Sequence, residues 1–446
     1  MKFTANTEQE KKEMLSSIGV AGVEELFKNI PSNALFSPKK EGILKKGISE
    51  MEVLAHLKNL SSKNLTVADH TGFLGAGSYF HFISAVVPAL ISRGEFLTAY
   101  TPYQPEASQG TLQATFEFQT MIADLYGMNI ANASLYDGAS ALAEAALLAL
   151  RETGRKKILV SRTTHPEYRL TLQTYCNDFE IVEIPYSKDG TVALEKLNEN
   201  LNEDVACVII QNPNFFGLIE DGQTIGELAQ KKNALFIVSA NPISLGILEP
   251  PGEYGADIAI GEGQPLGISL NYGGPYLGLF SCKEKHLRKV PGRIVGITKD
   301  LEDKRGFVLT LQTREQHIRR EKATSNICTN EALMALAATI HLSLLGPKGL
   351  KELAALNLKK AHLLSEEIKK IPDFKLSFSS PFFNEFVIQS KHKPEIIQEH
   401  CLKNKIVSGL NLSKFYPELE NAMLWCVTEM NSKDQILQLV SLLKGL

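Results

Sequence analysis

The sequence predicts an α/β protein, with a mostly parallel sheet in a large domain and a smaller α+β domain after it. Two observations support this prediction. Short apolar runs alternate with helical stretches between residues 130 and 282, and the C-terminal part mixes helices with isolated strand-like runs. Alternation at this spacing is typical of a parallel sheet covered on both faces. The length of 446 residues also favours more than one domain.

The N-terminal region, residues 1–93, is expected to be a helical arm with little strand character. Helical spacing is found at residues 8–15, 50–60 and 82–92, with a break at Pro31, Ser32 and Asn33. A longer amphipathic helix is predicted at residues 109–126, because its apolar residues recur on one side. These residues are Leu112, Phe116, Met121, Ile122 and Leu125.

The large domain is expected to span residues 94–330. Its predicted strands are residues 130–136, 157–160, 180–184, 205–210, 234–238, 257–260 and 277–280. Its predicted helices are residues 139–152, 168–175, 193–202 and 225–232. Each strand is a short apolar run, as expected for strands buried on both faces of a sheet.

The small C-terminal α+β domain is expected to span residues 331–446. A stretch rich in arginine and lysine precedes it, and a helix then begins near Thr329 and ends before Pro347. Further helices are predicted at residues 351–369, 394–403 and 433–443, and strands at 385–389 and 423–428.

Composition excludes several classes of function. The net charge of −3 leaves no basic field for nucleic acid or an anionic membrane surface. No apolar signal core begins the chain, and no stretch approaches the roughly 20 apolar residues of a membrane span. The six cysteines are scattered without a CxxC pair, and the histidines show no metal-binding spacing. A reduced, cytoplasmic location and no metal site are therefore expected.

The turn Asp137-Gly138-Ala139-Ser140 is the first candidate for a ligand site. It joins a predicted strand to a predicted helix, and free N–H groups at a helix N-terminus can hold a phosphate. The alternative is an ordinary turn in which Asp137 caps the helix, and a carboxylate there would repel a phosphate.

Three further residues follow predicted strands. His165 could stack on an aromatic cofactor or could be a buried, hydrogen-bonded histidine. Asn214 lies in an Asn/Pro/Gly turn that offers amides to a ligand or simply forms a loop. Asn241 stands where an enzyme that uses pyridoxal phosphate (PLP) carries an aspartate, whose charge keeps the pyridine nitrogen protonated. A neutral amide cannot hold that charge.

A gap in the lysine distribution bears on the same cofactor. No lysine occurs between Lys232 and Lys283, where a PLP enzyme of this architecture carries the lysine that binds the cofactor as a Schiff base. A partly desolvated amine can act both as nucleophile and as proton carrier, and no other side chain replaces it. The chain is therefore expected to be incomplete as a PLP enzyme by itself.

Three long stretches resemble the glycine decarboxylase (P-protein) family of the glycine cleavage system. They are residues 74–127, residues 250–278 and residues 319–330, the last reading RREKATSNICTN. With the units between them, the similarity covers essentially the whole chain. The chain resembles subunit 1 of the two-chain form, and residues 263–266 (GQPL) correspond to the stretch where subunit 2 has its histidine–lysine motif.

The resemblance implies a fold-type-I, PLP-dependent transferase-like architecture and a division of labour. PLP is expected to be held covalently by subunit 2, with no catalytic residue in this chain alone. The assembled enzyme is expected to decarboxylate glycine and to pass the aminomethyl group to the lipoyl group of the H protein. Asp137, Gly138, Ala139, Ser140, His165, Asn214 and Asn241 are then the candidates for a vestigial cofactor cleft.

The loop at residues 100–110 (YTPYQPEASQG) is the predicted contribution of this chain to the partner's active site. It concentrates polar and aromatic groups before a long helix. It reaches that site or lines the lipoyl entry path, or it only stabilises the dimer. Its candidate residues are Tyr100, Tyr103, Gln104, Glu106, Ser108 and Gln109. Two other functions stay open: a self-sufficient PLP enzyme with a lysine elsewhere, and a scaffold whose cleft binds nothing.

Overall fold

The computed structural model describes residues 5–35 and 47–446. The chain divides into two units, Met1–Leu65 and Thr66–Leu446. The predicted arm at residues 1–93 therefore extends into the second unit, where Phe73 and Val87 are buried. Residues 1–4 and 36–46 of that predicted arm lie outside the described residues.

In its described residues, the first unit contains two α-helices, α1 (Glu8–Ile18) and α2 (Glu50–Ser61), and a short 3-10 helix, Val23–Phe27. Both α-helices begin with a capping box, formed by Thr7 with Glu10 and by Ser49 with Glu52. Such boxes satisfy two free backbone N–H groups at each start, so the local sequence specifies these helices. Within the described residues of this unit, neither helix has a buried residue.

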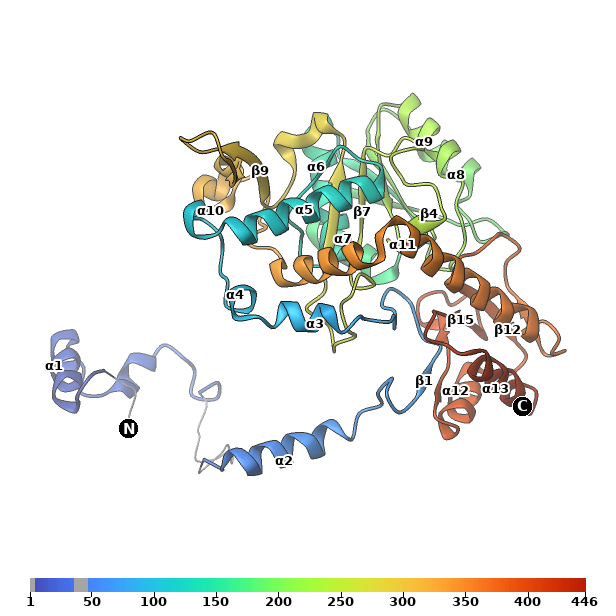
Figure 1. The fold of residues 1–446 in the computed structure, drawn as a ribbon, viewed down its shortest axis with the longest axis horizontal. Coiled ribbons are helices and arrows are strands. Elements are labelled where there is room, and N and C mark those ends of the chain that lie inside the picture. The colour runs from blue at the N-terminus through green and yellow to red at the C-terminus, as the bar shows by residue number, and fades with distance from the viewer. Residues whose placement is uncertain (1–4, 36–46) are drawn as a thin grey trace. The chain divides into compact units, whose positions relative to one another are not determined.

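The second unit, whose elements are drawn in Figure 1, is organised within the described residues by a sheet of seven strands. Their order is β2-β8-β7-β6-β5-β3-β4. Strands β4, β3, β5, β6 and β7 are parallel neighbours, whereas β8 pairs antiparallel with both β7 and β2. The strands are β2 (Ile130–Ala131), β3 (Lys157–Ser161), β4 (Glu180–Ile184), β5 (Val205–Gln211), β6 (Leu235–Ser239), β7 (Ile258–Glu262) and β8 (Gly278–Cys282).

Helices cover both faces of this sheet, as the sequence predicts. Helices α6 (Gly138–Thr153) and α7 (Pro166–Tyr175) pack against one set of strand residues, including Cys207 and Ile209. The alternate residues Val208 and Ile210 face the other core. That core receives α5 (Gln109–Tyr126), α8 (Leu194–Asn200), α9 (Gly222–Lys231) and part of α11 (Ala332–Ile368). The alternation follows from the two-residue period of a strand.

The C-terminal part has its own sheet and core. Its strands lie in the order β11-β12-β15-β14 within the described residues. Trp425 and Phe386 belong to its core, which also takes in Phe215 and Phe216 from the loop after β5. The elements are β11 (Phe374–Leu376), β12 (Glu385–Ser390), α12 (Pro394–Lys403), β13 (Ile406–Val407), β14 (Leu410–Asn411), β15 (Ala422–Cys426) and α13 (Lys433–Leu443). Strand β13 pairs with β1 (Thr71–Gly72), so the segment before the large sheet contacts this part of the protein.

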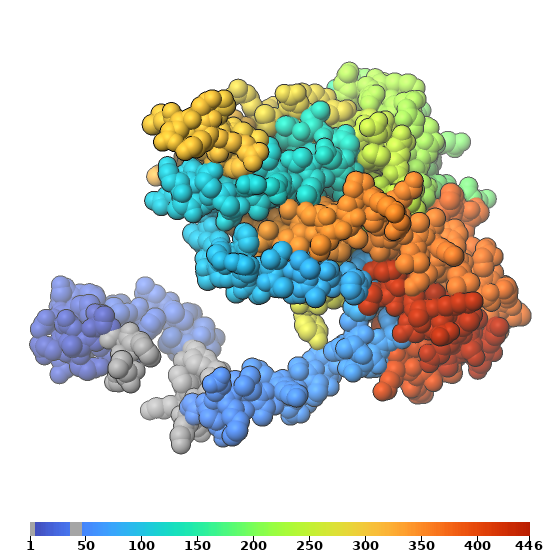
Figure 2. Space-filling model, viewed as in Figure 1, coloured from blue at the N-terminus to red at the C-terminus, as the bar shows by residue number. Residues whose placement is uncertain are grey.

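Helix α11 joins the two sheets and bends at Gly346, whose φ is +58°, immediately before Pro347. The predicted break before Pro347 is therefore a kink. By length and composition α11 is the one helix in the described part of the chain that is apolar enough to cross a membrane, which departs from the sequence expectation. Its residues Ala335 and Ala338 are buried in the large-domain core, as in the core helix of a globular protein. Figure 2 shows α11 (orange) between α5 (teal) and α3 (Val86–Ile91, blue).

Two predicted elements differ from the structure. The strand expected at residues 130–136 ends at Ala131, because Ser134 adopts a φ of +100°, which no regular strand allows. A hairpin of β9 (Ile294–Lys299) and β10 (Arg305–Thr310) occupies part of the stretch described as polar and rich in arginine and lysine.

Candidate vestigial cofactor cleft

A small cleft lies at the carboxyl edge of the parallel strands, where α/β proteins place ligand sites. Its walls come from the ends of β3, β5, β6 and β7, and from a loop before the sheet. Its cavity volume is about 30 Å³, enough for about two water molecules. Its lining residues are Gly77, Tyr79, His165, Tyr168, Gln211, Ser239, Ala240, Asn241, Pro242, Glu262 and Pro265.

The turn before α6 is a helix cap. The Asp137 carboxylate accepts the backbone N–H of Ser140 at 2.7 Å, and the Ser140 hydroxyl accepts the N–H of Asp137 at 3.2 Å. The capping alternative weighed for Asp137 is thus the arrangement found. Gly138 and Ala139 begin α6, and the N–H of Gly138 points at a second carboxylate.

That carboxylate belongs to Glu262, the last residue of β7, which the sequence analysis did not single out. It accepts backbone N–H groups from Gly138 at 3.0 Å, Gln264 at 2.9 Å and Leu277 at 3.0 Å. Burial raises the pKa of the Glu262 carboxyl to about 7, although the three N–H groups act to lower it. A charged residue that ends an apolar strand at the ligand edge was the sequence signal that could have identified it.

His165 is enclosed by protein groups. Its Nε2 contacts the carbonyl of Ala76 at 2.9 Å, and its Nδ1 accepts the N–H of Glu167 at 3.2 Å, which together define a neutral ring. Burial lowers the pKa of His165, in agreement with that state. The ring of Tyr168 stacks on the imidazole at 4.8 Å with an interplanar angle of 29°, and Phe215 meets it edge-on.

The two predicted asparagines differ in position. Asn241 lines the cleft, and its side-chain oxygen accepts the N–H of Ile243 at 3.0 Å. Asn214 is fully buried and is not among the lining residues of the cleft. Its side chain donates to Glu220 at 2.7 Å and to the carbonyl of Gly190 at 3.0 Å, so it holds its own loop together.

A segment before the large sheet, residues 74–82 (the roof segment), contributes Gly77 and Tyr79 to the lining of the cleft. Gln264 hydrogen-bonds both backbone polar groups of Tyr79, at 2.8 and 2.9 Å. Glu385, from β12 of the C-terminal sheet, accepts the N–H of Ala76 at 2.6 Å and the hydroxyl of Tyr79 at 2.7 Å. The roof segment is therefore bound to the large sheet and to the C-terminal sheet at once.

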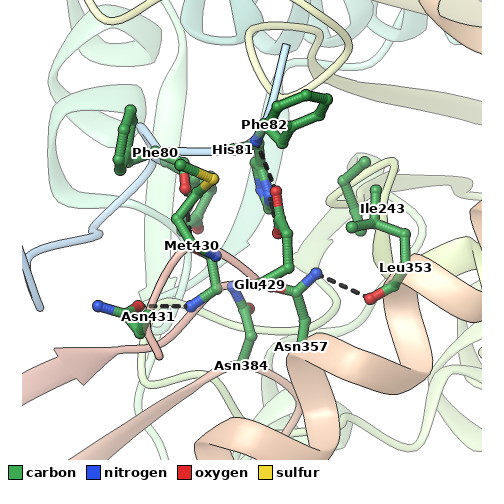
Figure 3. A network of polar contacts seen from close by, with 12 residues as sticks. Phe80, His81, Phe82, Ile243, Leu353, Asn357, Asn384, Glu429, Met430 and Asn431 are labelled. Atoms are coloured by element: carbon green, nitrogen blue, oxygen red, sulfur yellow. Dashed lines mark hydrogen bonds and ion pairs between the residues drawn. The ribbon is translucent and has the colours of Figure 1, made fainter. Parts of the chain in front are cut away.

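The far end of the roof segment is held by Glu429. Figure 3 shows its side chain facing His81 and Phe82. One carboxylate oxygen accepts the N–H of Phe82 at 2.6 Å and the other lies 2.8 Å from His81 Nδ1. Thr428 adds a hydrogen bond to the carbonyl of Phe80 at 2.7 Å.

The loop at residues 100–110 lies apart from this cleft and is largely open to solvent. Tyr100 is 91% exposed, and Tyr103 packs on the guanidinium of Arg293 and on His317. Gln104 and Glu106 are exposed, and Ser108 precedes α5 without a side-chain cap. Gln109 turns inward instead, since its side chain bonds to both backbone groups of Phe307 at 2.8 and 2.9 Å. A role of this loop at a partner's active site stays a prediction.

The residues of the cleft do not fit PLP. A neutral amide stands at Asn241, a carboxylate fills the helix N-terminus, and the ring that stacks on His165 is that of Tyr168. No lysine is available in residues 233–282. Among the residues that the structure describes, no group of histidine, cysteine, aspartate and glutamate is arranged to hold a metal ion.

The sheet order, the helices on both faces and the place of the cleft define a fold-type-I, PLP-dependent transferase-like protein, which confirms the predicted fold class. Sphingosine-1-phosphate lyase from Burkholderia pseudomallei shares this fold, with a TM-score of 0.67 at 14% identity over 92% of each chain. The family described as "Glycine cleavage system P-protein" matches residues 1–443. The chain belongs to this family.

The relatives and one solved structure agree with this assignment. A protein of Desulfitobacterium hafniense named "Probable glycine dehydrogenase (decarboxylating) subunit 1" is 55% identical over 99% of both chains. A protein of the same name from Carboxydothermus hydrogenoformans is 52% identical over the full length of both. A crystal structure of glycine decarboxylase (P-protein) in inhibitor-bound form covers 100% of both chains, with 44% identity and a TM-score of 0.87. The predicted resemblance to subunit 1 is confirmed.

Proposed function

We propose that the chain is subunit 1 of a two-chain, PLP-dependent glycine decarboxylase of the cytoplasm. In this proposal, glycine decarboxylase subunit 2 holds the cofactor through its lysine. The assembled enzyme decarboxylates glycine and passes the aminomethyl group to the lipoyl group of the H protein. The cofactor, when bound by the partner, supplies the electron sink that decarboxylation requires.

One observation carries the proposal: a cleft in the place expected for the cofactor has no lysine, no charged partner for a pyridine nitrogen and almost no free volume. The names of the relatives, which specify a subunit 1, support a second chain that carries these features.

The contribution of this chain is then positional. Decarboxylation requires a fixed substrate geometry, and a rigid wall supplied by a neighbouring chain helps to maintain it. The loop at residues 100–110 is our candidate wall, because Tyr100, Gln104 and Glu106 are exposed ahead of a long, well-packed helix.

The test is an exchange assay between glycine and labelled bicarbonate with lipoylated H protein. The partner subunit is assayed alone, with this chain, and with Tyr103→Phe or Glu106→Gln variants of this chain. We expect exchange only when both chains are present, and reduced turnover with normal assembly in the variants. Exchange by this chain alone, together with a borohydride-reducible chromophore, would refute the proposal.

A further inference from the structure

A phosphorylated aromatic ring bound at this edge of the sheet would need two places. The phosphate would need free N–H groups at the start of α6, and the ring would need the face of His165. In this chain, side chains of the protein itself occupy both places.

Glu262 occupies the anion place. Its carboxylate binds the N–H of Gly138, the first residue of α6, and two other backbone N–H groups that converge on it. Donors arranged in this way recognise an oxyanion, and the positive end of the α6 dipole strengthens that preference. The ligand of these three N–H groups is a carboxylate of the same chain, and a further N–H at the start of α6, that of Ser140, is already held by the Asp137 carboxylate.

Tyr168 occupies the ring place. Its ring stacks on His165 at an interplanar angle of 29°, and its hydroxyl end reaches the start of α6. A methyl group added at Gly138 would lie 2.2 Å from the Tyr168 hydroxyl oxygen. The phenol therefore spans the distance between the stacking histidine and the phosphate-type cradle, as a bound aryl phosphate would.

We propose that Tyr168 and Glu262 are a built-in substitute for an aryl phosphate, and that removing both side chains uncovers a latent site for such a ligand. The roof segment adds Tyr79 to the lining of the cleft, where Gln264 and Glu385 hold it. In this substitute, Tyr168 supplies the packing of the cofactor's ring and Glu262 supplies the anion of its phosphate.

The test compares the wild-type chain with a Tyr168→Ala/Glu262→Ala double variant. The probe is pyridoxine 5′-phosphate, which has no aldehyde and cannot react with surface lysines, and pyridoxine is the control without phosphate. Binding is measured by calorimetry, and folding by circular dichroism. A Tyr186→Ala/Glu418→Ala variant is a matched control, because it removes a hydrogen-bonded tyrosine–glutamate pair (2.6 Å) that does not line the cleft.

We expect the cleft double variant to bind pyridoxine 5′-phosphate about tenfold or more tightly than the wild type or the control variant, with no gain for pyridoxine. Binding of the phosphate by the wild type as tight as by the double variant, or no gain in a folded double variant, would overturn the proposal. If the double variant does not fold, Glu262→Ala alone decides: inorganic phosphate should raise its melting temperature beyond chloride of equal ionic strength, and no rise would refute the anion cradle. These readouts use this chain alone, so they stand apart from the exchange assay of the assembled enzyme.

Discussion

Replacing Glu429 with alanine tests how the roof segment is held. The side chain of Glu429 is 10% exposed and that of His81 is 3% exposed, so both groups are removed from water. The variant leaves the Nδ1 of the buried His81 without its partner, whereas the exposed Phe82 can give its N–H to water. A buried group left unsatisfied costs about 1–3 kcal/mol. We therefore expect a loss of about 1–3 kcal/mol in the free energy of unfolding.

Urea unfolding followed by tryptophan fluorescence measures this loss directly. Trp425 is the single tryptophan, and it is buried in the C-terminal core near the site. The matched control is Glu352→Ala, which removes an exposed ion pair to Lys348 at 3.8 Å and should change stability by no more than about 0.5 kcal/mol. Equal stability of the Glu429 and Glu352 variants would show that the carboxylate does not hold the roof segment.

The pH dependence of the same variant has a defined sign. Burial alone would raise the pKa of Glu429, but the hydrogen bonds from His81 and from the Phe82 N–H outweigh it and the pKa is lowered. The stabilisation is therefore present above the pKa of an unfolded glutamate and is lost as the pH falls through the lower, folded pKa. The difference in stability between wild type and Glu429→Ala should shrink in acid, and a constant difference would contradict this reasoning.

Three other outcomes are expected. Gly217→Ala should lower the free energy of unfolding by more than about 3 kcal/mol or abolish folding, because the added methyl would lie 1.9 Å from the backbone oxygen of Glu385 and Gly217 has a φ of +84°. Gly154 has a φ of +67° but lies in open space, so Gly154→Ala should cost only about 1 kcal/mol. Thermal melts of both variants measure the difference. Burial raises the pKa of Glu385 to about 7, so the folded protein binds this proton more tightly than the unfolded chain and wild-type stability should fall as the pH rises from about 4.5 to about 7. Glu385→Gln should flatten that part of the pH profile of stability, measured by urea unfolding. An unchanged slope in the variant would show that Glu385 does not cause the fall. Pro265→Lys alone should give no PLP adduct at position 265 after borohydride reduction and peptide mapping, because Tyr168 and Glu262 occupy the places of the ring and the phosphate. An adduct at this position would show that the cleft can accept PLP.

Sequence periodicity predicts the large sheet well and its edges less well. The apolar runs of β3, β5, β6 and β7 are buried on both faces, so burial and pattern coincide, whereas the edge strand β4 is only partly buried. Strand β2 is shorter than predicted because the backbone at Ser134 cannot continue a strand. The β9–β10 hairpin was not predicted, although its strands IVGITK and RGFVLT each carry a single charged residue; each also contains a glycine, a residue depleted in strands.

Some features of the cleft can be predicted from the sequence and others cannot. The Asp137 cap depends on residues three apart and is readable in the sequence. The role of Glu262 depends on Gly138, which is more than a hundred residues away, and that of Gln264 depends on Tyr79 at similar separation. Such long-range pairs follow from the assembled sheet, and no local pattern specifies them.

The double attachment of the roof segment has an evolutionary consequence. Gln264 bonds to the backbone of Tyr79, and Glu385 bonds to the Tyr79 hydroxyl, so only the second bond depends on the side chain at position 79. Natural subunit 1 sequences should therefore exchange Tyr79 and Glu385 together, because losing either side chain leaves a polar group of the other buried without this partner. A lineage that restored a cofactor-binding lysine after β7 would also have to release the backbone of Tyr79 from Gln264.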